Sequence, residues 1–367
     1  MTLLRLTYML AVIAAATTAA HAQISLTPPT LQQPPADKPK PAERPAEKAA
    51  DKPKPPAVTK KPAPAPAPTA KPAAPAPVAS PQPPQPAATD PNVDLVYGAY
   101  QRGQYKTAFD LATPRAQAGD PKAMAMLGQL YENAMGIRRD YEKAAIWYKR
   151  AAEAGDREAM FALAMMRLAG RGGPVDKQEA VKLLASAAKL GEPKAAYNLA
   201  LLYLDGQTLP QDVRRSAELL RQAADAGLPE AQYALATFYK EGTGVPKDPD
   251  RAVRLLQAAS LADNVDAEVE YAIALFNGTG TPQNRPAAVA LLRKASRQGS
   301  AIAQNRLAWV LINGMGVPVD KVEGFKWHLV AKTSGKGDPE LDKQLSDLPA
   351  DDRAKAEAAA RKWLGTK

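Results

Sequence analysis

Small and apolar residues recur along most of the chain with a period of 36 residues. A glycine ladder with this spacing has one missing rung, Asp263, and otherwise consists of Gly119, Gly155, Gly191, Gly227, Gly299 and Gly335. Two alanine ladders run in step with it: Ala123, Ala159, Ala195, Ala231, Ala267 and Ala303, and Ala151, Ala187, Ala223, Ala259, Ala295 and Ala331. Agreement of several phases over six copies predicts a tandem structural repeat.

Within each copy the pattern predicts two helices, here called helix A and helix B. In the first copy, Ala123 and Leu127 share one face at helical spacing, and Pro121 follows Asp120 as the first helical residue after its cap. Helix B of this copy places Ala151 on its inward face. Alanine at these ladder positions lets neighbouring helices approach closely.

Turn residues separate the two helices at matching positions in each copy. Loops such as Gly242-Thr243-Gly244 supply backbone freedom, and Pro246 stops helix A from continuing. A polar ladder is predicted to cap helix B: Asp140, Asp176, Asp212, Asp248, Asn284 and Asp320. The ladder glycine is then expected to end helix B in the left-handed conformation.

These residues resemble the Sel1-like repeat, a relative of the tetratricopeptide repeat. The motif Ala-x3-Leu-Gly/Ala-x2-Tyr-x2-Gly-x-Gly-Val-x2-Asp-x3-Ala-x2-Trp/Leu-x3-Ala-Ala is almost complete between Ala231 and Ala259. The resemblance covers residues 119–335 within a repeat domain predicted over residues 119–337. It implies an all-α solenoid, in which six 36-residue hairpins stack into a right-handed superhelix. It implies function by analogy only, since some relatives act as adaptors in the cell envelope.

The flanks of the repeat region depart from its pattern. Residues 92–118 keep part of the phase but join their helices through the short Arg102-Gly103-Gln104, which resembles a tetratricopeptide half-copy acting as an N-terminal cap. Residues 338–367 lose the ladders and carry many charges, as expected of C-terminal capping helices.

The first 22 residues have the features of a signal peptide. Arg5 precedes the apolar run 6–20, and Ala20-His21-Ala22 forms a cleavage site before Gln23. We therefore expect a periplasmic or secreted protein with no membrane span after cleavage. An uncleaved N-terminal anchor is the alternative.

Residues 23–91 are predicted to be a disordered linker. Between Pro28 and Pro91 lie 22 of the 35 prolines, mixed with alanine and lysine, so there is little apolar surface to bury. The simplest interpretation is a solvated spacer in extended polyproline conformation. Weak contact of its lysines with anionic envelope polymers is the alternative.

Composition narrows the chemistry. The chain has no cysteine, and His328 is the only histidine left after signal cleavage, so thiolate catalysis and zinc sites with two imidazoles are excluded. His328 shares its phase with leucines and is expected to be packed. The net charge of +10 includes the basic linker and does not indicate a nucleic-acid partner. No cofactor or metal site is predicted.

Two motifs imitate catalytic signatures. The Gly-x-Gly loops join helix to helix and recur at the repeat period, which favours turns over phosphate binding. Ser186-Ala187-Ala188-Lys189 matches the Ser-x-x-Lys of penicillin-binding enzymes, but no Ser-Asp-Asn accompanies it. A cell-wall or β-lactam hydrolase using Ser186 and Lys189 is kept as an alternative.

A row of varied residues on helix A is the candidate partner site. By analogy with tetratricopeptide repeats, two phases of helix A should face the concave groove, where aromatic and amide groups suit an extended peptide. The predicted residues, called here the helix A row, are Phe161, Met165, Tyr197, Leu201, Tyr233, Thr237, Asn305 and Trp309. The alternative is that the tyrosines pack against the neighbouring copy. Trp309→Ala with Tyr233→Ala is predicted to weaken partner capture without loss of helicity.

Two non-catalytic functions therefore remain besides the hydrolase. The first is a protein–protein interaction scaffold or regulator in the bacterial cell envelope, which binds segments of a protein or peptide partner on the concave face. The second is a structural protein of the cell wall, held there by its basic linker. The sequence does not name the partner.

Overall fold

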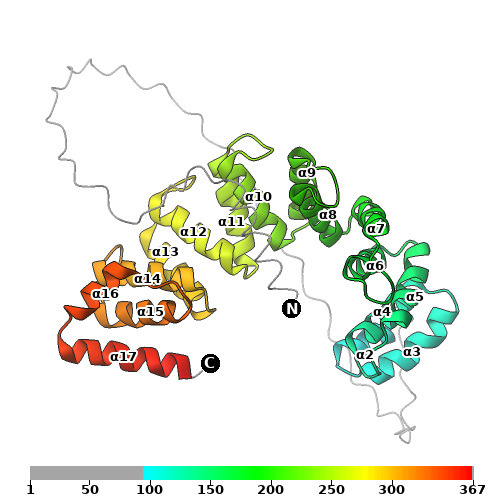
Figure 1. Ribbon diagram of the computed structural model, residues 1–367, viewed down its shortest axis with the longest axis horizontal. Helices are drawn as coiled ribbons and strands as arrows, with labels where there is room; N and C mark the ends of the chain where they lie inside the picture. The colour runs from blue at the N-terminus through cyan, green and yellow to red at the C-terminus, as the bar shows by residue number, and fades with distance from the viewer. Residues whose placement is uncertain (1–93, 366–367) are drawn as a thin grey trace, which may run out of the picture. The chain divides into compact units, whose positions relative to one another are not determined.

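The computed structural model describes residues 94–365, and this part of the chain is built of α-helices without strands. In Figure 1 the helices follow one another in chain order from α2 to α17. The six copies are α4 (Pro121–Asn133) with α5 (Tyr141–Glu153), α6 (Arg157–Ala169) with α7 (Lys177–Lys189), α8 (Pro193–Asp205) with α9 (Val213–Asp225), α10 (Pro229–Glu241) with α11 (Pro249–Leu261), α12 (Val265–Asn277) with α13 (Arg285–Arg297), and α14 (Ala301–Asn313) with α15 (Lys321–Thr333). We number them copies 1 to 6.

Two further pairs of helices flank the copies. Before them lie α2 (Leu95–Gln101) and α3 (Tyr105–Gln117), joined through Arg102-Gly103-Gln104; after them lie α16 (Pro339–Ser346) and α17 (Ala350–Gly365). The last helix, α17, packs against α15.

The polar ladder caps helix B in every copy, as the sequence predicts. Each side chain accepts a hydrogen bond from the backbone N–H three residues further on, for example Asp140 from Lys143 at 3.0 Å and Asn284 from Ala287 at 3.1 Å. The same geometry holds at Asp176, Asp212, Asp248 and Asp320. These bonds satisfy backbone donors that the first turn of a helix leaves free, and so fix where helix B begins.

The glycine ladder ends helix B in the left-handed region. All six ladder glycines have positive φ, between 73° at Gly335 and 98° at Gly119. At the missing rung Asp263 adopts the same conformation with φ 59°, one of two non-glycine residues with positive φ in the described part of the chain. The repeat geometry therefore overrides the preference of an L residue at this position.

Close packing between consecutive helices makes the core. Each helix of the copies packs against the next one along the chain. Ladder alanines such as Ala195 and Ala223 have no exposed surface, so the helices meet without a gap at these positions. One apolar cluster runs without interruption from α6 to α12, and smaller clusters continue it toward α2. This nearest-neighbour packing confirms the predicted all-α solenoid.

The second glycine of the A–B loop allows one copy to touch the next. A Cβ at Gly280 would lie 2.5 Å from the carbonyl oxygen of Pro249, at the start of the preceding helix B. Gly172 and Gly244 make the same contact with Tyr141 and Val213. The predicted Gly-x-Gly turn thus has a second role, because its backbone packs directly on the neighbouring copy.

The predicted signal peptide (1–22) and linker (23–91) lie outside the described residues. Within residues 94–365, none of the helices combines the length and the apolar character needed to cross a bilayer.

Candidate partner-binding surfaces

The helix A row is half-buried through copies 2 to 4. Phe161 and Met165 on α6, Leu201 on α8, and Tyr233 on α10 each keep part of their surface accessible. Tyr197 is the exception: it occupies the same phase as Tyr233 but is only 7% exposed. The accessible part of the row therefore extends over three successive copies but does not include Tyr197.

Both tyrosines of the row have carboxylates nearby. Burial raises the pKa of Tyr197 to about 12, with a smaller contribution from Glu230. Burial and the nearby Glu270 also raise the pKa of Tyr233 above its usual range. Both phenols thus stay neutral at physiological pH and can donate a hydrogen bond. Burial likewise raises the pKa of Asp266, which also faces Glu270.

Thr237 is the second residue of the helix A row on α10. Its hydroxyl donates to the backbone oxygen of Tyr233 at 3.3 Å, and its side chain is half-buried. From the same helix, Lys240 pairs with Glu270 of α12 at 3.0 Å. Copies 4 and 5 therefore combine aromatic and polar groups with carboxylates at this face.

The end of the row in copy 6 is used by the C-terminal segment. Trp309 donates its indole N–H to the carboxylate of Asp338 at 2.8 Å, and Asn305 donates its amide to the backbone oxygen of Lys336 at 3.2 Å. Asp338 is also the N-cap of α16. Removing the Trp309 indole would therefore loosen the docking of α16, so Trp309→Ala does not isolate an effect on partner binding.

The side chains of the alternative hydrolase lie on one exposed helix surface. Ser186 and Lys189 are both exposed on α7, and no hydrogen bond joins them. His328, in contrast, is fully buried on α15 and its Nε2 lies 2.9 Å from Asp342. Lys332 and then His328 hold the pKa of Asp342 below its usual range, so this carboxylate anchors α16 to α15.

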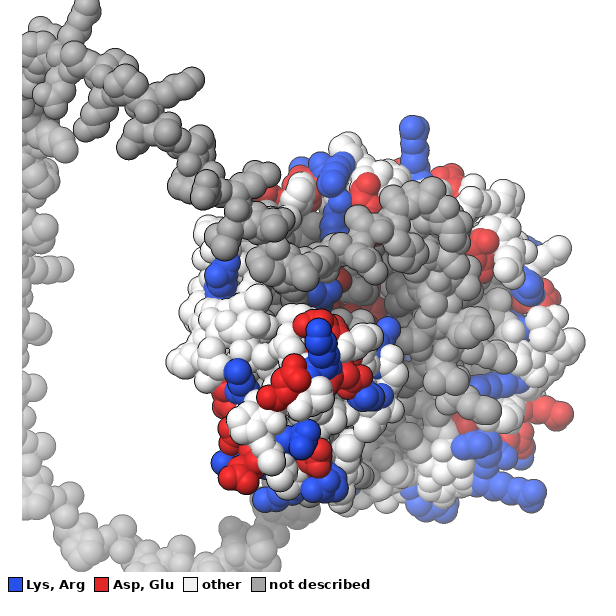
Figure 2. All heavy atoms as spheres, turned by 60° about the vertical axis from the view of Figure 1, so that its left-hand side comes forward, with Lys and Arg blue, Asp and Glu red and all other residues white. Residues whose placement is uncertain are grey.

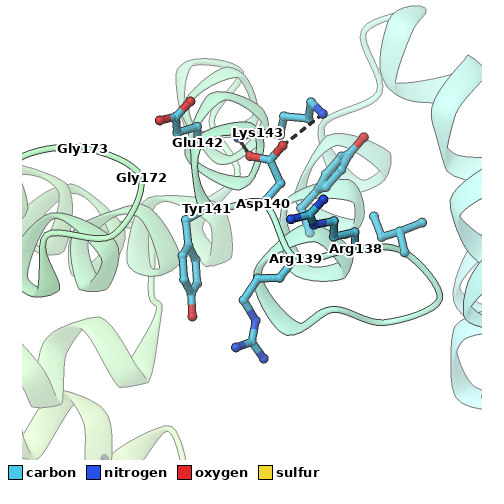
Figure 3. Close-up of a pocket in the computed structure, with 10 residues that line it drawn as sticks. Arg138, Arg139, Asp140, Tyr141, Glu142, Lys143, Gly172 and Gly173 are labelled. Carbon is cyan, nitrogen blue, oxygen red and sulfur yellow. Dashed lines mark hydrogen bonds and ion pairs between the residues drawn. The ribbon is translucent and has the colours of Figure 1, made fainter.

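The structure also shows a pocket that no repeating position of the sequence predicts. It lies beside the A–B loop of copy 1, between that loop and the loop of copy 2, and opens to solvent (Figure 3). Its lining comprises Tyr131, Ile137, Arg138, Arg139, Asp140, Tyr141, Glu142, Lys143, Gly172 and Gly173. Both glycines belong to the loop that packs on the start of α5.

Arginine and tyrosine side chains meet at this pocket. The guanidinium carbons of Arg139 and Arg171 lie 5.8 Å and 5.7 Å from the centre of the Tyr141 ring, within the range of cation–π contact. Arg139 and Tyr141 project toward the same side in Figure 3. Asp140 is held by Lys143, whose backbone N–H and then its ammonium lower the pKa of the carboxyl. On the face seen in Figure 2, which brings forward the left-hand side of Figure 1, charges of both signs are intermingled.

Comparison with protein families explains the periodic architecture. The sequence profile described as Sel1 repeat matches residues 121–156, 157–192, 193–228, 229–264, 265–300 and 301–335. The chain belongs to the Sel1 repeat family. Each matched segment begins at a helix A and ends just after the following helix B, so the Sel1 repeats coincide with copies 1 to 6.

Solved structures with the same fold support this assignment. A Sel1 repeat protein from Oxalobacter formigenes is 27% identical, with a TM-score of 0.60 over 66% of this chain and 100% of that one. A protective antigen of uropathogenic Escherichia coli strains is also 27% identical, with a TM-score of 0.64 over 74% of this chain. The chain spans 59% of the length of that antigen. No match was found among curated protein sequences.

Proposed function

We propose that this Sel1 repeat protein is a non-catalytic interaction scaffold or regulator of the bacterial cell envelope, which binds a segment of a protein partner along the helix A row. Sel1 repeats form interaction scaffolds in other members of the family, which supports the general role. The signal-like sequence at residues 1–22 supports the envelope location.

The observation that carries the proposal is the continuity of the row across copies. Met165, Leu201 and Tyr233 stand on helix A of copies 2, 3 and 4 and are all half-buried. A partner segment lying across them would contact one copy after another, as extended peptides do on helical repeat surfaces. Half-buried side chains are already partly ordered, so binding costs less conformational entropy than it would for fully exposed ones.

The surrounding charges indicate the character of the partner segment. Glu230 and Asp266 lie close to the tyrosines of copies 3 and 4, and Glu270, which is paired with Lys240, lies beside Tyr233. Basic side chains next to apolar ones in the partner would complement this surface and would increase the rate of association.

Site-specific photo-cross-linking in living cells tests the proposal. A photoreactive amino acid placed at Leu201 or at Thr237 should capture the same partner, because both positions lie on the row in adjacent copies. Matched probes at Ser186 and Lys189, which are exposed on helix B, should not capture it. Mass spectrometry of the adducts then identifies the protein.

The opposite pattern would refute the proposal. Equal capture from helix A and helix B positions would indicate non-specific proximity, and capture only from Ser186 and Lys189 would move the binding site to helix B. Substrate turnover that is lost in Ser186→Ala would replace the scaffold with an enzyme.

A further inference from the structure

Copy 1 departs from the other five copies in the loop before helix B. At the position of Arg138 every other copy has a proline: Pro174, Pro210, Pro246, Pro282 and Pro318. Proline fixes the backbone and prevents helix A from continuing, so it is the residue that suits the repeat fold at this position. Tyr141 and Arg171 are also the only tyrosine and the only arginine at their positions in the six copies. Stacking therefore does not account for these three residues.

The three residues surround the same pocket. Arg138 and Tyr141 line it directly, and Arg171 reaches the ring of Tyr141 from the loop of copy 2. The pocket thus depends on two adjacent copies, whose relative position is fixed by the packing of Gly172 on Tyr141. This backbone contact places the loop of copy 2, which carries Arg171, against the start of α5.

Two of the guanidinium groups are free to bind a ligand. Within the described part of the chain, Arg138 has neither an ion pair nor a side-chain hydrogen bond, and Arg139 has only its contact with the Tyr141 ring. Both side chains are exposed. A guanidinium carries five N–H donors in a planar fork that matches the two oxygens of a carboxylate.

We propose that this pocket, called here the arginine pocket, binds an acidic segment of a protein partner. Carboxylates of the segment pair with Arg138 and Arg139, and the ring of Tyr141 packs against the carbon atoms between them. The proposal rests on the interaction role proposed above and adds a second contact surface, outside the helix A row.

Local carboxylates favour a peptide over a continuous polyanion. Asp140 and Glu142 line the pocket, and Glu132 lies 3.6 Å from Arg171. These groups would repel the closely spaced phosphates of a nucleic acid or of polyphosphate, whose binding depends on a continuous basic track. Separate glutamate or aspartate side chains can meet the arginines while avoiding the acidic positions.

The repeat itself supplies a variant that should fold. At the position of Arg139, copies 3 and 5 carry Gln211 and Gln283, which each donate to a backbone oxygen seven residues earlier at 2.9 Å. Arg138→Ala with Arg139→Gln therefore removes both free charges and introduces a side chain that closes this loop in other copies. Lys247→Gln is the matched control, because Lys247 is exposed at the same position of copy 4.

Fluorescence anisotropy with a labelled hexaglutamate peptide tests the arginine pocket in the full chain at low salt. The parent protein and Lys247→Gln should bind it alike, and the double variant should bind at least about tenfold more weakly, because two charged donors are lost. Hexaglutamine should not bind. Thermal unfolding followed by circular dichroism checks that the double variant is folded.

Two results would overturn this inference. Equal affinity of the parent and the folded double variant would show that the arginines do not bind the peptide. Tighter binding of inorganic polyphosphate than of hexaglutamate, lost in the same variant, would assign the pocket to a phosphate polymer instead. Photo-cross-linking of a partner from Leu201 and Thr237 does not depend on these arginines. The proposal that the helix A row binds a partner is therefore tested independently of the arginine pocket.

Discussion

Gly280→Ala should destabilise the repeat array by about 2–5 kcal/mol. A left-handed alanine costs about 1–2 kcal/mol relative to glycine, and here φ is 68°. The added methyl would also meet the carbonyl oxygen of Pro249 at 2.5 Å, so the loop of copy 5 must move away from helix B of copy 4. Overpacking of this kind adds about 1–3 kcal/mol. The shift of the midpoint in urea unfolding measures the effect.

Gly227→Ala separates the two contributions. Gly227 has φ 85°, but a Cβ built there finds no atom within 4 Å. This control should lose only the left-handed term, about 1–2 kcal/mol. If both substitutions shift the midpoint equally, the second loop glycine does not hold adjacent copies together.

The second large effect concerns a buried carboxylate in copy 5. Glu268 has no exposed surface, and its partner is Lys294, whose Nζ lies 2.6 Å from Oε1 in an ion pair without good hydrogen-bond geometry. Lys294→Ala should cost about 3 kcal/mol, because it leaves a buried charge without compensation. We take the low end of the known range since Lys294 is 40% exposed and water can approach its place.

Glu268→Gln provides the matched background. Copies 4 and 6 carry Gln232 and Gln304 at this position, and each donates to a backbone oxygen eight residues earlier, at 3.3 Å and 3.1 Å. The amide should make the same bond in copy 5, so Glu268→Gln alone should be nearly neutral. Lys294→Ala should then cost little in that background. An equal loss in both backgrounds, measured by urea unfolding, would show that Lys294 stabilises the array by other contacts.

The sequence predicted the parts of the fold that repeat. Each ladder position has the same role in six copies, so its residue type reports one physical requirement six times. Asp140 and its equivalents cap helix B, and Ala195 is buried at a helix crossing, as the ladders indicated. Asp263 departs from the glycine ladder in residue type only. It adopts the same left-handed backbone conformation as the glycines, because the position in the repeat requires it.

The candidate site was predicted less well, because exposure depends on neighbours that do not repeat. Tyr197 and Tyr233 share one phase, yet only Tyr197 is fully packed. Trp309 is bonded by Asp338, which follows the last copy and has no counterpart within the period. The position within the repeat alone therefore predicted the same exposure for residues whose surroundings differ.

The arginine pocket was missed although the sequence held its signal. Agreement between copies indicates the fold, whereas Arg138 is informative because it differs from the proline of the other five copies. Its meaning became clear only when the structure placed Tyr141 and Arg171 beside the same loop. Departures from a repeat pattern thus indicate candidate sites, and the ladders indicate the scaffold.

Partner binding across successive copies is tested most directly by the affinity of the partner captured from Leu201 and Thr237. Met165→Ala, Leu201→Ala and Tyr233→Ala lie in copies 2, 3 and 4, and each should weaken binding by about 1 kcal/mol. Their free energies should add approximately in the triple variant, because the sites are on different helices. Ser186→Ala should bind as the parent does. A loss confined to one copy, or a loss in Ser186→Ala alone, would contradict binding along the helix A row.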